Sequence, residues 1–326
     1  MLLPRDDGPG TADADPTAHG VLHWAPRHHE GLLERAARLT GWLHDARPAL
    51  VVVDVSVEVT LLTRLAGVPV AVAAMLGDRT DRAHRLAHDV ADLLLAPWPA
   101  RTEPGWPDDW QAKTVHVGAF SRFDAEPPPS PERLAAARAA WPAGAGRRVL
   151  AFWGRAATTS RSPTAARCAS GRRRAGAGST AAAAPPPPPT CGPSLHAADV
   201  VVTHAGHNAV AEVAAARRPA VVVAQRRPHD EQVARARLLH DQGLAVALDA
   251  WPRTDAWPAL LDAAADAGGA AWARWSPGDG ARAMAAAVDA LAATPSRRDA
   301  RSGSPGAAQV NRSSHLGTEG AEEVGS

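Results

Sequence analysis

The stretch "VVTHAGHNAVAE" (201–212) places polar residues where an apolar run passes into an alanine-rich, helix-prone segment. A strand that turns through Gly206 into a helix points the unpaired N–H groups of that helix at the crevice along the sheet edge. These donors and the helix dipole favour an anion, above all a phosphate. Gly206 has no side chain, so backbone and ligand can approach closely. His204 adds a donor or a positive charge, and Asn208 either caps the helix or reaches a phosphate oxygen.

Carboxylate and carboxamide side chains follow this turn along the chain. Glu212, one helical turn further on, can accept hydrogen bonds from the paired hydroxyls of a ribose. The segment "HDEQ" (229–232) opens the next helix, where Asp230, Glu231 and Gln232 can bind the hydroxyls of a sugar. An isolated "HAGHN" is equally compatible with a tight strand-to-helix turn that holds no ligand, so the prediction depends on the whole set being in register.

The elements that must position these residues alternate between strands and helices. Apolar, β-branched runs bounded by turn residues predict buried parallel strands, and amphipathic runs between them predict helices. The predicted strands are 48–59, 68–75, the end of 82–98, 148–154, 198–206, 218–225 and 244–249, and the predicted helices are 28–48, 60–67, the start of 82–98, 207–217 and 230–243. This alternation predicts an α/β fold with two Rossmann-like domains.

The α/β pattern stops and restarts once, which divides the chain. Residues 1–123 form a predicted N-terminal domain, and 124–147 form a proline-rich linker with one short helix. Residues 148–294 form the C-terminal domain that carries the predicted phosphate site, and 295–326 form a polar tail that we expect to be disordered.

One segment inside the C-terminal domain breaks the pattern. Residues 155–194 contain no Val, Leu, Ile, Phe, Met or Trp, and five consecutive prolines exclude helix and central strand there. Such a composition cannot bury enough apolar surface to offset the entropy of ordering. Two explanations are open, a local frame shift in G+C-rich DNA and a genuine flexible insertion.

The composition excludes several classes of protein. A net charge of +1 gives no broad cationic field, so nucleic acid is not an expected partner. The start has no signal-peptide pattern, and no apolar run is long enough for a transmembrane segment, so we expect a cytoplasmic protein. The abundance of Ala, Arg, Pro and Gly indicates a G+C-rich bacterial genome. The two cysteines form neither a disulfide framework nor a metal-binding spacing.

The pattern "THAGHNAVAE…P…DEQ" resembles the donor-binding motif of GT-B glycosyltransferases, both the UDP-glycosyltransferase superfamily and family 28. The resemblance covers about residues 195–250. It implies that His204, Gly206 and Asn208 face the donor diphosphate, that Glu212 holds the ribose, and that Glu231–Gln232, next to Asp230, hold the transferred sugar. Two positions depart from the family: Ala209 removes a common hydroxyl, and Arg217 replaces a common glycine.

The same resemblance implies a catalytic base in the N-terminal domain. Family members begin with a strand and a Gly-rich loop that carries a histidine, whereas this chain begins "MLLPRDDGPG", so we expect its N-terminal domain to lack the first βαβ region. Asp54, at the carboxyl end of a predicted strand, is the remaining candidate base, with Glu58 as second choice. Asp54 is equally explained as a helix N-cap or a loop carboxylate.

The function implied is transfer of a hexose from a UDP- or dTDP-sugar to the hydroxyl of a small-molecule, lipid or glycan acceptor, by an inverting hexosyltransferase without metal or other cofactor. His84 and His88 are one helical turn apart, but no acid stands where a metalloprotease needs it, so no metal site is predicted. Two other functions stay open. One is a non-catalytic remnant that binds a nucleotide sugar weakly or not at all, and the other is a sugar-nucleotide epimerase of the same fold.

Overall fold

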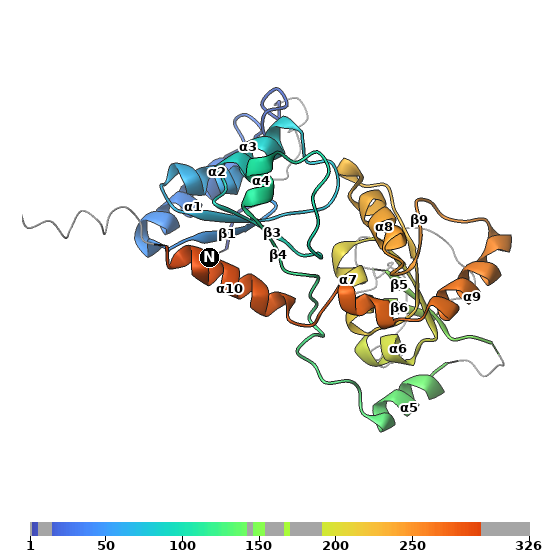
Figure 1. Ribbon diagram of the computed structural model, residues 1–326. Coiled ribbons are helices and arrows are strands. Elements are labelled where there is room, and N and C mark those ends of the chain that lie inside the picture. Colours follow the sequence, from blue (N-terminus) through green and yellow to red (C-terminus); the bar gives the residue numbers. More distant parts are fainter. Residues whose placement is uncertain (1, 6–14, 142–145, 154–165, 170–190, 295–326) are drawn as a thin grey trace, which may run out of the picture. The chain divides into compact units, whose positions relative to one another are not determined.

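The computed structural model describes residues 2–5, 15–141, 146–153, 166–169 and 191–294. The first sheet has four parallel strands in the order β1-β2-β3-β4, with Val51 opposite Val70 and Ala71 opposite Leu93 (Figure 1). Its strands are β1 (Val51–Asp54), β2 (Val70–Ala73), β3 (Leu93–Ala96) and β4 (Thr114–His116). The helices along this part of the chain are α1 (Glu30–Ala46), α2 (Val57–Leu65), α3 (Arg82–Val90) and α4 (Asp108–Ala112).

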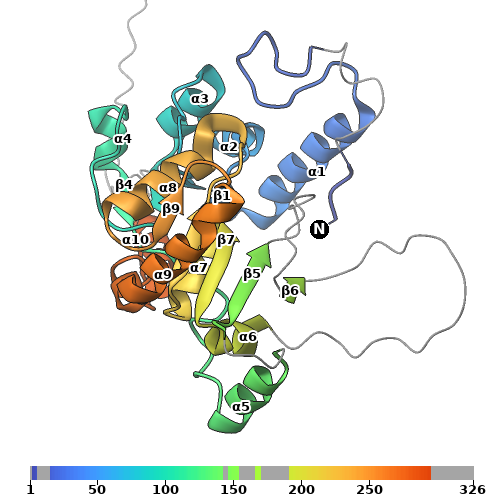
Figure 2. The same ribbon diagram turned by 90° about the vertical axis from the view of Figure 1, so that its right-hand side faces the viewer.

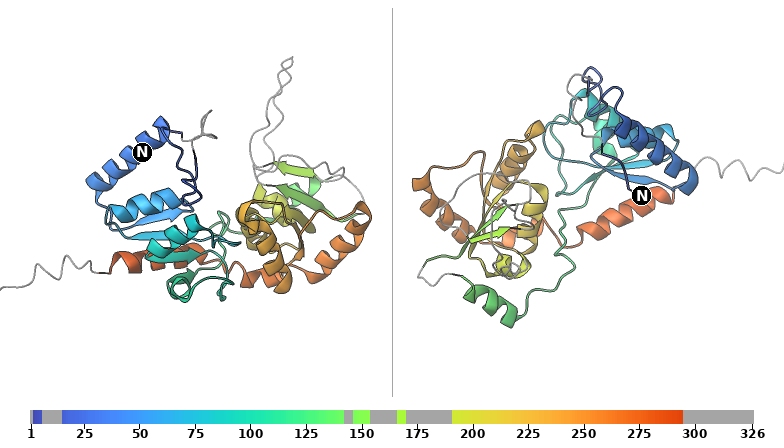
Figure 3. Two further views of the ribbon diagram at one scale, coloured as in Figure 1. Left: turned by 90° about the horizontal axis from the view of Figure 1, so that it is seen from above. Right: turned by 180° about the vertical axis from the view of Figure 1, so that it is seen from behind.

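The last helix, α10 (Gly280–Ala292), packs on the first sheet although it follows the second one in sequence. Ala71, Leu93 and Leu95 point to one face of β2 and β3 and contact Met284 and Val288 of the helix. Figure 1 shows α10 on the opposite side of this sheet from α1–α4, and Figure 3 shows the same layer from two other directions. Burial of alternate strand residues on both faces explains the continuous apolar run of β3.

The second sheet has five parallel strands in the order β6-β5-β7-β8-β9 (Figure 2). Its strands are β5 (Val149–Trp153), β6 (Ala166–Ala169), β7 (Val200–His204), β8 (Ala220–Val223) and β9 (Val246–Leu248). The helical elements around it are α5 (Pro131–Ala139), α6 (Cys191–Ala197), α7 (His207–Ala215), η1 (Pro228–Asp230), α8 (Glu231–Asp241), η2 (Thr254–Ala256), α9 (Trp257–Ala267) and η3 (Ala270–Arg274).

Helices cover both faces of the second sheet. Val200, Val202 and the alternate residues of β8 pack against Leu260 and Leu261 of α9. The intervening residues of β7 and β8 face the larger core, which contains the apolar side chains of α7 and α8. A doubly wound arrangement of this kind opens ligand crevices at the carboxyl ends of the strands, where β7 passes into α7.

The structure confirms the α/β fold class, and most predicted elements appear within a few residues of their expected bounds. The strand predicted over 48–59 is wrong in its second half, because β1 ends at Asp54 and α2 begins at Val57. Ser56 is the N-cap of that helix, and its Oγ accepts a hydrogen bond from Val59 N at 3.3 Å. The N-cap bond and the acidic residue in the first turn override the β propensity of the valines.

Parts of the anomalous segment 155–194 are included in the structure. β6 pairs in parallel with β5, with Leu150 opposite Ala166, and α6 begins at Cys191. Residues 166–169 and 191–194 therefore belong to regular elements, although the composition of the segment argues against ordering. The proline run and the predicted tail of 295–326 lie outside the described residues. The domain boundaries at 123, 147 and 294 stay predictions from the sequence.

No helix in the part of the chain that the structure describes combines the length and the apolar character needed to cross a bilayer.

Candidate functional site

The strand-to-helix turn after β7 forms as the sequence predicts, but Gly206 is required for another reason. Gly206 is the N-cap residue of α7 and has φ −72° and ψ 146°, a conformation open to any residue. A Cβ built on Gly206 would lie 2.2 Å from Cε1 of His204, well inside van der Waals contact. The imidazole therefore excludes a side chain at Gly206, and packing fixes the glycine independently of any ligand.

His204 connects the turn to the next helix. The N–H of Gly206 donates to Nδ1 of His204 at 2.9 Å, and the imidazole also hydrogen-bonds the side chain of Gln232. With Nδ1 as acceptor, the remaining ring N–H is on Nε2. Burial lowers the pKa of His204, although the hydrogen bond with Gln232 works in the opposite direction. Near pH 7 His204 is therefore a neutral, oriented imidazole that acts through hydrogen bonding.

The first turn of α7 presents one exposed and one half-buried polar side chain. Asn208 is the second residue of the helix and is exposed, so the expectation that it caps the helix is wrong and its contact with phosphate stays a prediction. Burial lowers the pKa of the neighbouring His207 to about 3, with the cation of Arg235 as a second cause. His207 therefore adds no positive charge near pH 7.

Glu212 lies in the second turn of α7, is mostly buried and forms an ion pair. Its Oε1 is 3.1 Å from Nε of Arg122, a residue distant in sequence. Burial raises the pKa of the Glu212 carboxyl, and the Arg122 cation partly opposes that shift. A half-desolvated carboxylate with one cationic partner is a suitable acceptor for two adjacent hydroxyls.

The predicted sugar-binding residues at the start of α8 are engaged with the protein. Gln232 Oε1 accepts a hydrogen bond from Gln225 N at 3.1 Å, in addition to its contact with His204. Glu231 lies between two guanidinium groups, with Oε1 3.2 Å from Arg235 Nη1 and Oε2 3.6 Å from Arg79 Nη2. The preceding Asp230 is exposed, has a left-handed φ of 49°, and makes no side-chain cap bond as N-cap of α8.

Arg235 is a residue of this site that the sequence analysis missed. Its side chain is 1% exposed, and Nη1 donates to the carbonyl oxygen of Ala205 at 2.6 Å, directly beneath the β7–α7 turn. Arg235 thus ties α8 to the turn that carries His204 and Gly206. The (i, i+4) spacing from Glu231 was the available signal, since such pairs lie on one helix face.

The two candidate bases have different surroundings. Asp54 ends β1 and is exposed, and no hydrogen bond or ion pair among the described residues links its carboxylate to the group around His204. The alternative that Asp54 caps a helix is wrong, because Ser56 is the N-cap of α2. Glu58 Oε1 accepts hydrogen bonds from the backbone N–H groups of His23 at 2.8 Å and Trp24 at 2.7 Å. Those two bonds explain Glu58 as a structural carboxylate.

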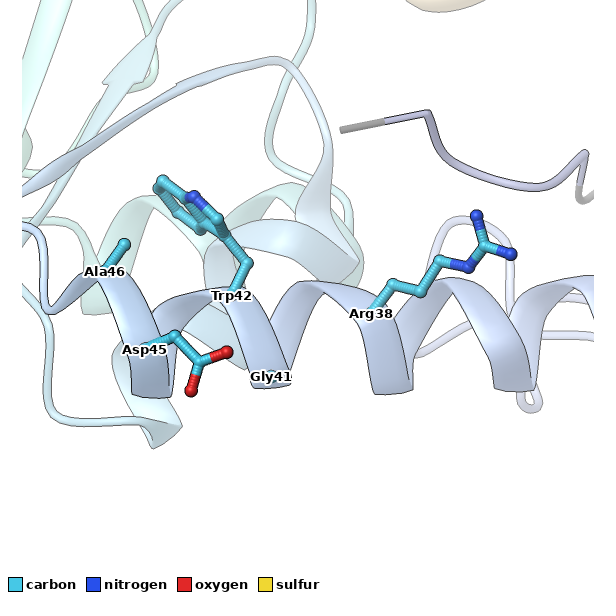
Figure 4. A pocket seen from close by; sticks show the side chains of 5 residues that line it. All are labelled: Arg38, Gly41, Trp42, Asp45 and Ala46. Carbon is cyan, nitrogen blue, oxygen red and sulfur yellow. The ribbon is translucent and has the colours of Figure 1, made fainter.

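An open surface depression lies away from these residues, over α1. Figure 4 shows that it is lined from that one helix, with Trp42 and Arg38 projecting from successive turns. Its lining residues are Arg38, Gly41, Trp42, Asp45 and Ala46. None of them belongs to the predicted site.

A protein-family model matches the part of the chain that contains this site. Residues 189–256 match the model of the "Glycosyltransferase family 28 C-terminal domain", which covers the β7–α7 turn and the start of α8. No curated protein matches the chain. The structure is similar to the glycotransferase of kitacinnamycin, with 18% identity, a TM-score of 0.51, and 80% of this chain and 81% of that chain covered.

Two further solved structures are similar. A putative UDP-N-acetylglucosamine 2-epimerase from Listeria monocytogenes shares 14% identity, with 82% of each chain covered and a TM-score of 0.50. The glycosyltransferase SnogD from Streptomyces nogalater shares 16% identity, with 79% of each chain covered and a TM-score of 0.46. At these identities the first two similarities, those with TM-scores of 0.50 and above, establish the fold alone. The chain therefore has the two-sheet GT-B fold, and its residues 189–256 are similar to the C-terminal domain of glycosyltransferase family 28.

Proposed function

We propose that this protein transfers a hexose from a UDP- or dTDP-sugar to an acceptor hydroxyl. The observation that carries the proposal is the hydrogen bond between His204 and Gln232, which joins the two separate parts of the donor motif. The family match over residues 189–256 includes both. Small-molecule, lipid and glycan acceptors all present the required hydroxyl. The cytoplasmic location and the bacterial source stay predictions from the sequence.

The donor diphosphate is placed at the N-terminus of α7. The first-turn N–H groups have no partner within the helix and, with the dipole, favour a dianionic group. His204 holds the turn that carries these groups, because its Nδ1 accepts from Gly206 N–H and its ring bonds Gln232, and the exposed carboxamide of Asn208 supplies a further donor. Preorganised donors of this kind stabilise the charge that develops on the departing diphosphate, so the proposal requires no metal ion for that step.

Glu212 and Gln232 bind the two other parts of the donor, the ribose and the transferred sugar. The Glu212 carboxylate accepts hydrogen bonds from the ribose hydroxyls, and Gln232, with Asp230 and Glu231 beside it, meets the hydroxyls of the transferred sugar. Because Glu231 is already bound to Arg235, its part is to hold the start of α8 in place.

The chemical step is a displacement at the anomeric carbon. The acceptor oxygen forms the new bond to that carbon, the bond from carbon to the diphosphate oxygen breaks with its electron pair, and the acceptor proton passes to a base. We assign that base to Asp54, the exposed carboxylate at the carboxyl end of β1. Inversion at the anomeric carbon follows from one displacement on the face opposite the leaving group.

An assay with radiolabelled UDP- and dTDP-hexoses, with and without a panel of hydroxylated acceptors, tests the proposal. Transfer to an acceptor, lost in Asp54→Asn and retained in the exposed control Glu132→Gln, is the expected result. Nucleotide binding without any turnover identifies a non-catalytic remnant. An isomerised donor sugar in the absence of acceptor identifies an epimerase, the function given to one of the similar structures.

A further inference from the structure

Three histidines from distant parts of the sequence meet outside the donor site. His23 precedes α1, His84 lies in the first turn of α3, and His229 lies in η1 immediately before α8. One ring nitrogen of each lies within 4.8 Å of the other two. The ring centroid of His84 lies 4.7 Å from that of His23 and 4.7 Å from that of His229. The centroids of His23 and His229 are 5.8 Å apart.

Hydrogen bonds to the backbone of each histidine fix its position. The N–H of His23 donates to Glu58 Oε1 at 2.8 Å, and the N–H of His84 donates to Oδ1 of Asp81, the N-cap of α3. His229 has a left-handed φ of 62°, which is uncommon for a residue other than glycine, and its carbonyl oxygen accepts from Asp78 N at 2.9 Å. The cluster therefore does not depend on side-chain rotamers alone.

The loop around Gly77 explains how His229 comes so close to α3. Gly77 has φ +102°, and a Cβ there would lie 2.3 Å from the carbonyl oxygen of His229. Only glycine satisfies both conditions, so the chain is built for a close approach of these two loops.

Asp81 orients the ring of His84 and lies close to the ring of His229. Its Oδ2 lies 2.6 Å from Nδ1 of His84 and 3.6 Å from Nδ1 of His229. A carboxylate that accepts from Nδ1–H leaves the Nε2 lone pair of the imidazole exposed to a Lewis acid. A carboxylate behind a histidine ligand is the usual outer partner at zinc sites.

We propose that His23, His84 and His229 bind one divalent transition-metal ion, with Zn²⁺ as the best match and Asp81 as the positioning residue. Three imidazoles with a fourth position left for water form an established zinc coordination set. A tetrahedral zinc ion with bonds of about 2.0–2.1 Å needs ligand atoms roughly 3.4 Å apart. The ligand atoms must therefore approach one another by up to about 1.4 Å, and the exposed side chain of His23 has room to move.

Arg79 is the group that competes with the metal. Its Nη1 lies 3.3 Å from Nε2 of His84, and its Nη2 lies 3.6 Å from Oε2 of Glu231. A bound ion must displace the Arg79 guanidinium from His84. The displaced guanidinium can then bind the nearby Glu231 carboxylate. The metal would thus tie the segment before α1 to α3 and to the start of α8, without taking part in the chemistry of the diphosphate.

The test uses the full chain without a histidine tag, treated with a chelator and then titrated with Zn²⁺ or Co²⁺. We expect one metal per chain, a tetrahedral Co²⁺ absorption spectrum, and a higher unfolding temperature with Zn²⁺. His84→Ala and His229→Gln should each weaken Zn²⁺ binding at least about 100-fold, and Asp81→Asn about 10- to 100-fold. Arg79→Gln should tighten it.

The matched control is His28→Gln, which removes an exposed histidine adjacent to another histidine and should leave Zn²⁺ affinity unchanged. His23→Gln covers the case in which the buried His84 variant fails to fold, because its side chain is exposed and folding can be checked by circular dichroism. The proposal is overturned if the folded chain binds no stoichiometric metal. It is equally overturned if the His23 and His28 variants lose binding to the same extent.

Discussion

Nε of Arg122 lies 3.1 Å from Oε1 of Glu212, although the Arg122 side chain is 58% exposed and that of Glu212 only 12% exposed. The buried carboxylate thus has a solvent-facing counter-ion, whose guanidinium lies over the ring of Phe123. Burial raises the Glu212 pKa and Arg122 lowers it, so the cation helps to keep the carboxylate ionised. A ribose that binds Glu212 has to share or displace this partner.

This pair predicts a pH dependence of nucleotide binding. Affinity for UDP or dTDP should fall as the pH drops through the raised pKa of Glu212, because the protonated carboxyl loses an acceptor site. In Arg122→Gln the fall should begin at higher pH, since the cation that lowers the pKa is gone. Calorimetric titrations between pH 5 and pH 8 measure it, and Glu212→Gln corrects for titration of the phosphates. A midpoint unchanged by Arg122→Gln would show that the ion pair has no part in binding.

A second prediction concerns the glycine of the turn. Gly206→Ala places a methyl group 2.2 Å from Cε1 of His204 and must push the imidazole from its place. We expect a loss of about 1–3 kcal/mol in the free energy of unfolding, measured in urea, together with loss of nucleotide binding. The double variant His204→Ala/Gly206→Ala should regain most of the stability but not the binding. Equal stability of the single and double variants would refute the packing explanation.

A third prediction follows from His88, which is buried against the rings of Trp106 and Trp110. Burial lowers its pKa from 6.5 to about 4. The folded state therefore favours the neutral ring, and this stabilisation is present above pH 6.5 and is lost as the pH falls towards 4. Between pH 7 and pH 5 the loss is about 2 kcal/mol from His88 alone.

Urea unfolding of wild type and His88→Leu at pH 7 and pH 5 measures this effect. The variant should show a smaller decrease in stability between the two pH values, whereas the exposed control His44→Gln should behave as wild type. The same decrease in all three proteins would contradict the assignment to His88.

The fourth prediction compares two arginines of α8 that are two residues apart. Arg235 is 1% exposed and binds Glu231 and the Ala205 carbonyl, so Arg235→Met removes a buried cation and leaves the half-buried Glu231 carboxylate with Arg79 as its remaining cationic partner. We expect a loss of about 3–5 kcal/mol in unfolding free energy. Arg237 is 66% exposed and pairs with Asp249, and Arg237→Met should cost less than about 1 kcal/mol. Similar losses for both would show that the buried pair has no special structural role.

The sequence predicted those features that depend on neighbouring residues. The strand ending at His204, the turn at Gly206 and the helix from His207 all follow from local apolar periodicity and one glycine. The α2 boundary was missed because Val57 and Val59 read as a strand, while the decisive hydrogen bond to Ser56 Oγ is a single capping contact.

Contacts between residues that are far apart in the sequence cannot be predicted from local hydrophobic periodicity. Glu58 is a structural carboxylate because it meets the backbone of His23, and no periodicity reports that pairing. Arg122 contacts Glu212, and His84 contacts His229, across long separations in the sequence. The helical spacing of His84 and His88 suggests these two as the possible metal-binding pair, whereas the histidines nearest to His84 for shared metal binding are His23 and His229.

The central claim is that the group around His204, Gly206 and Glu212 binds the diphosphate and ribose of a sugar nucleotide. Isothermal titration of the folded chain with UDP and with dTDP at pH 7 tests it most directly. The account predicts binding of one nucleotide per chain, weakened roughly 10- to 100-fold in Glu212→Ala by loss of hydrogen bonds to a charged group. No heat with either nucleotide, or an affinity that Glu212→Ala leaves unchanged, would contradict it.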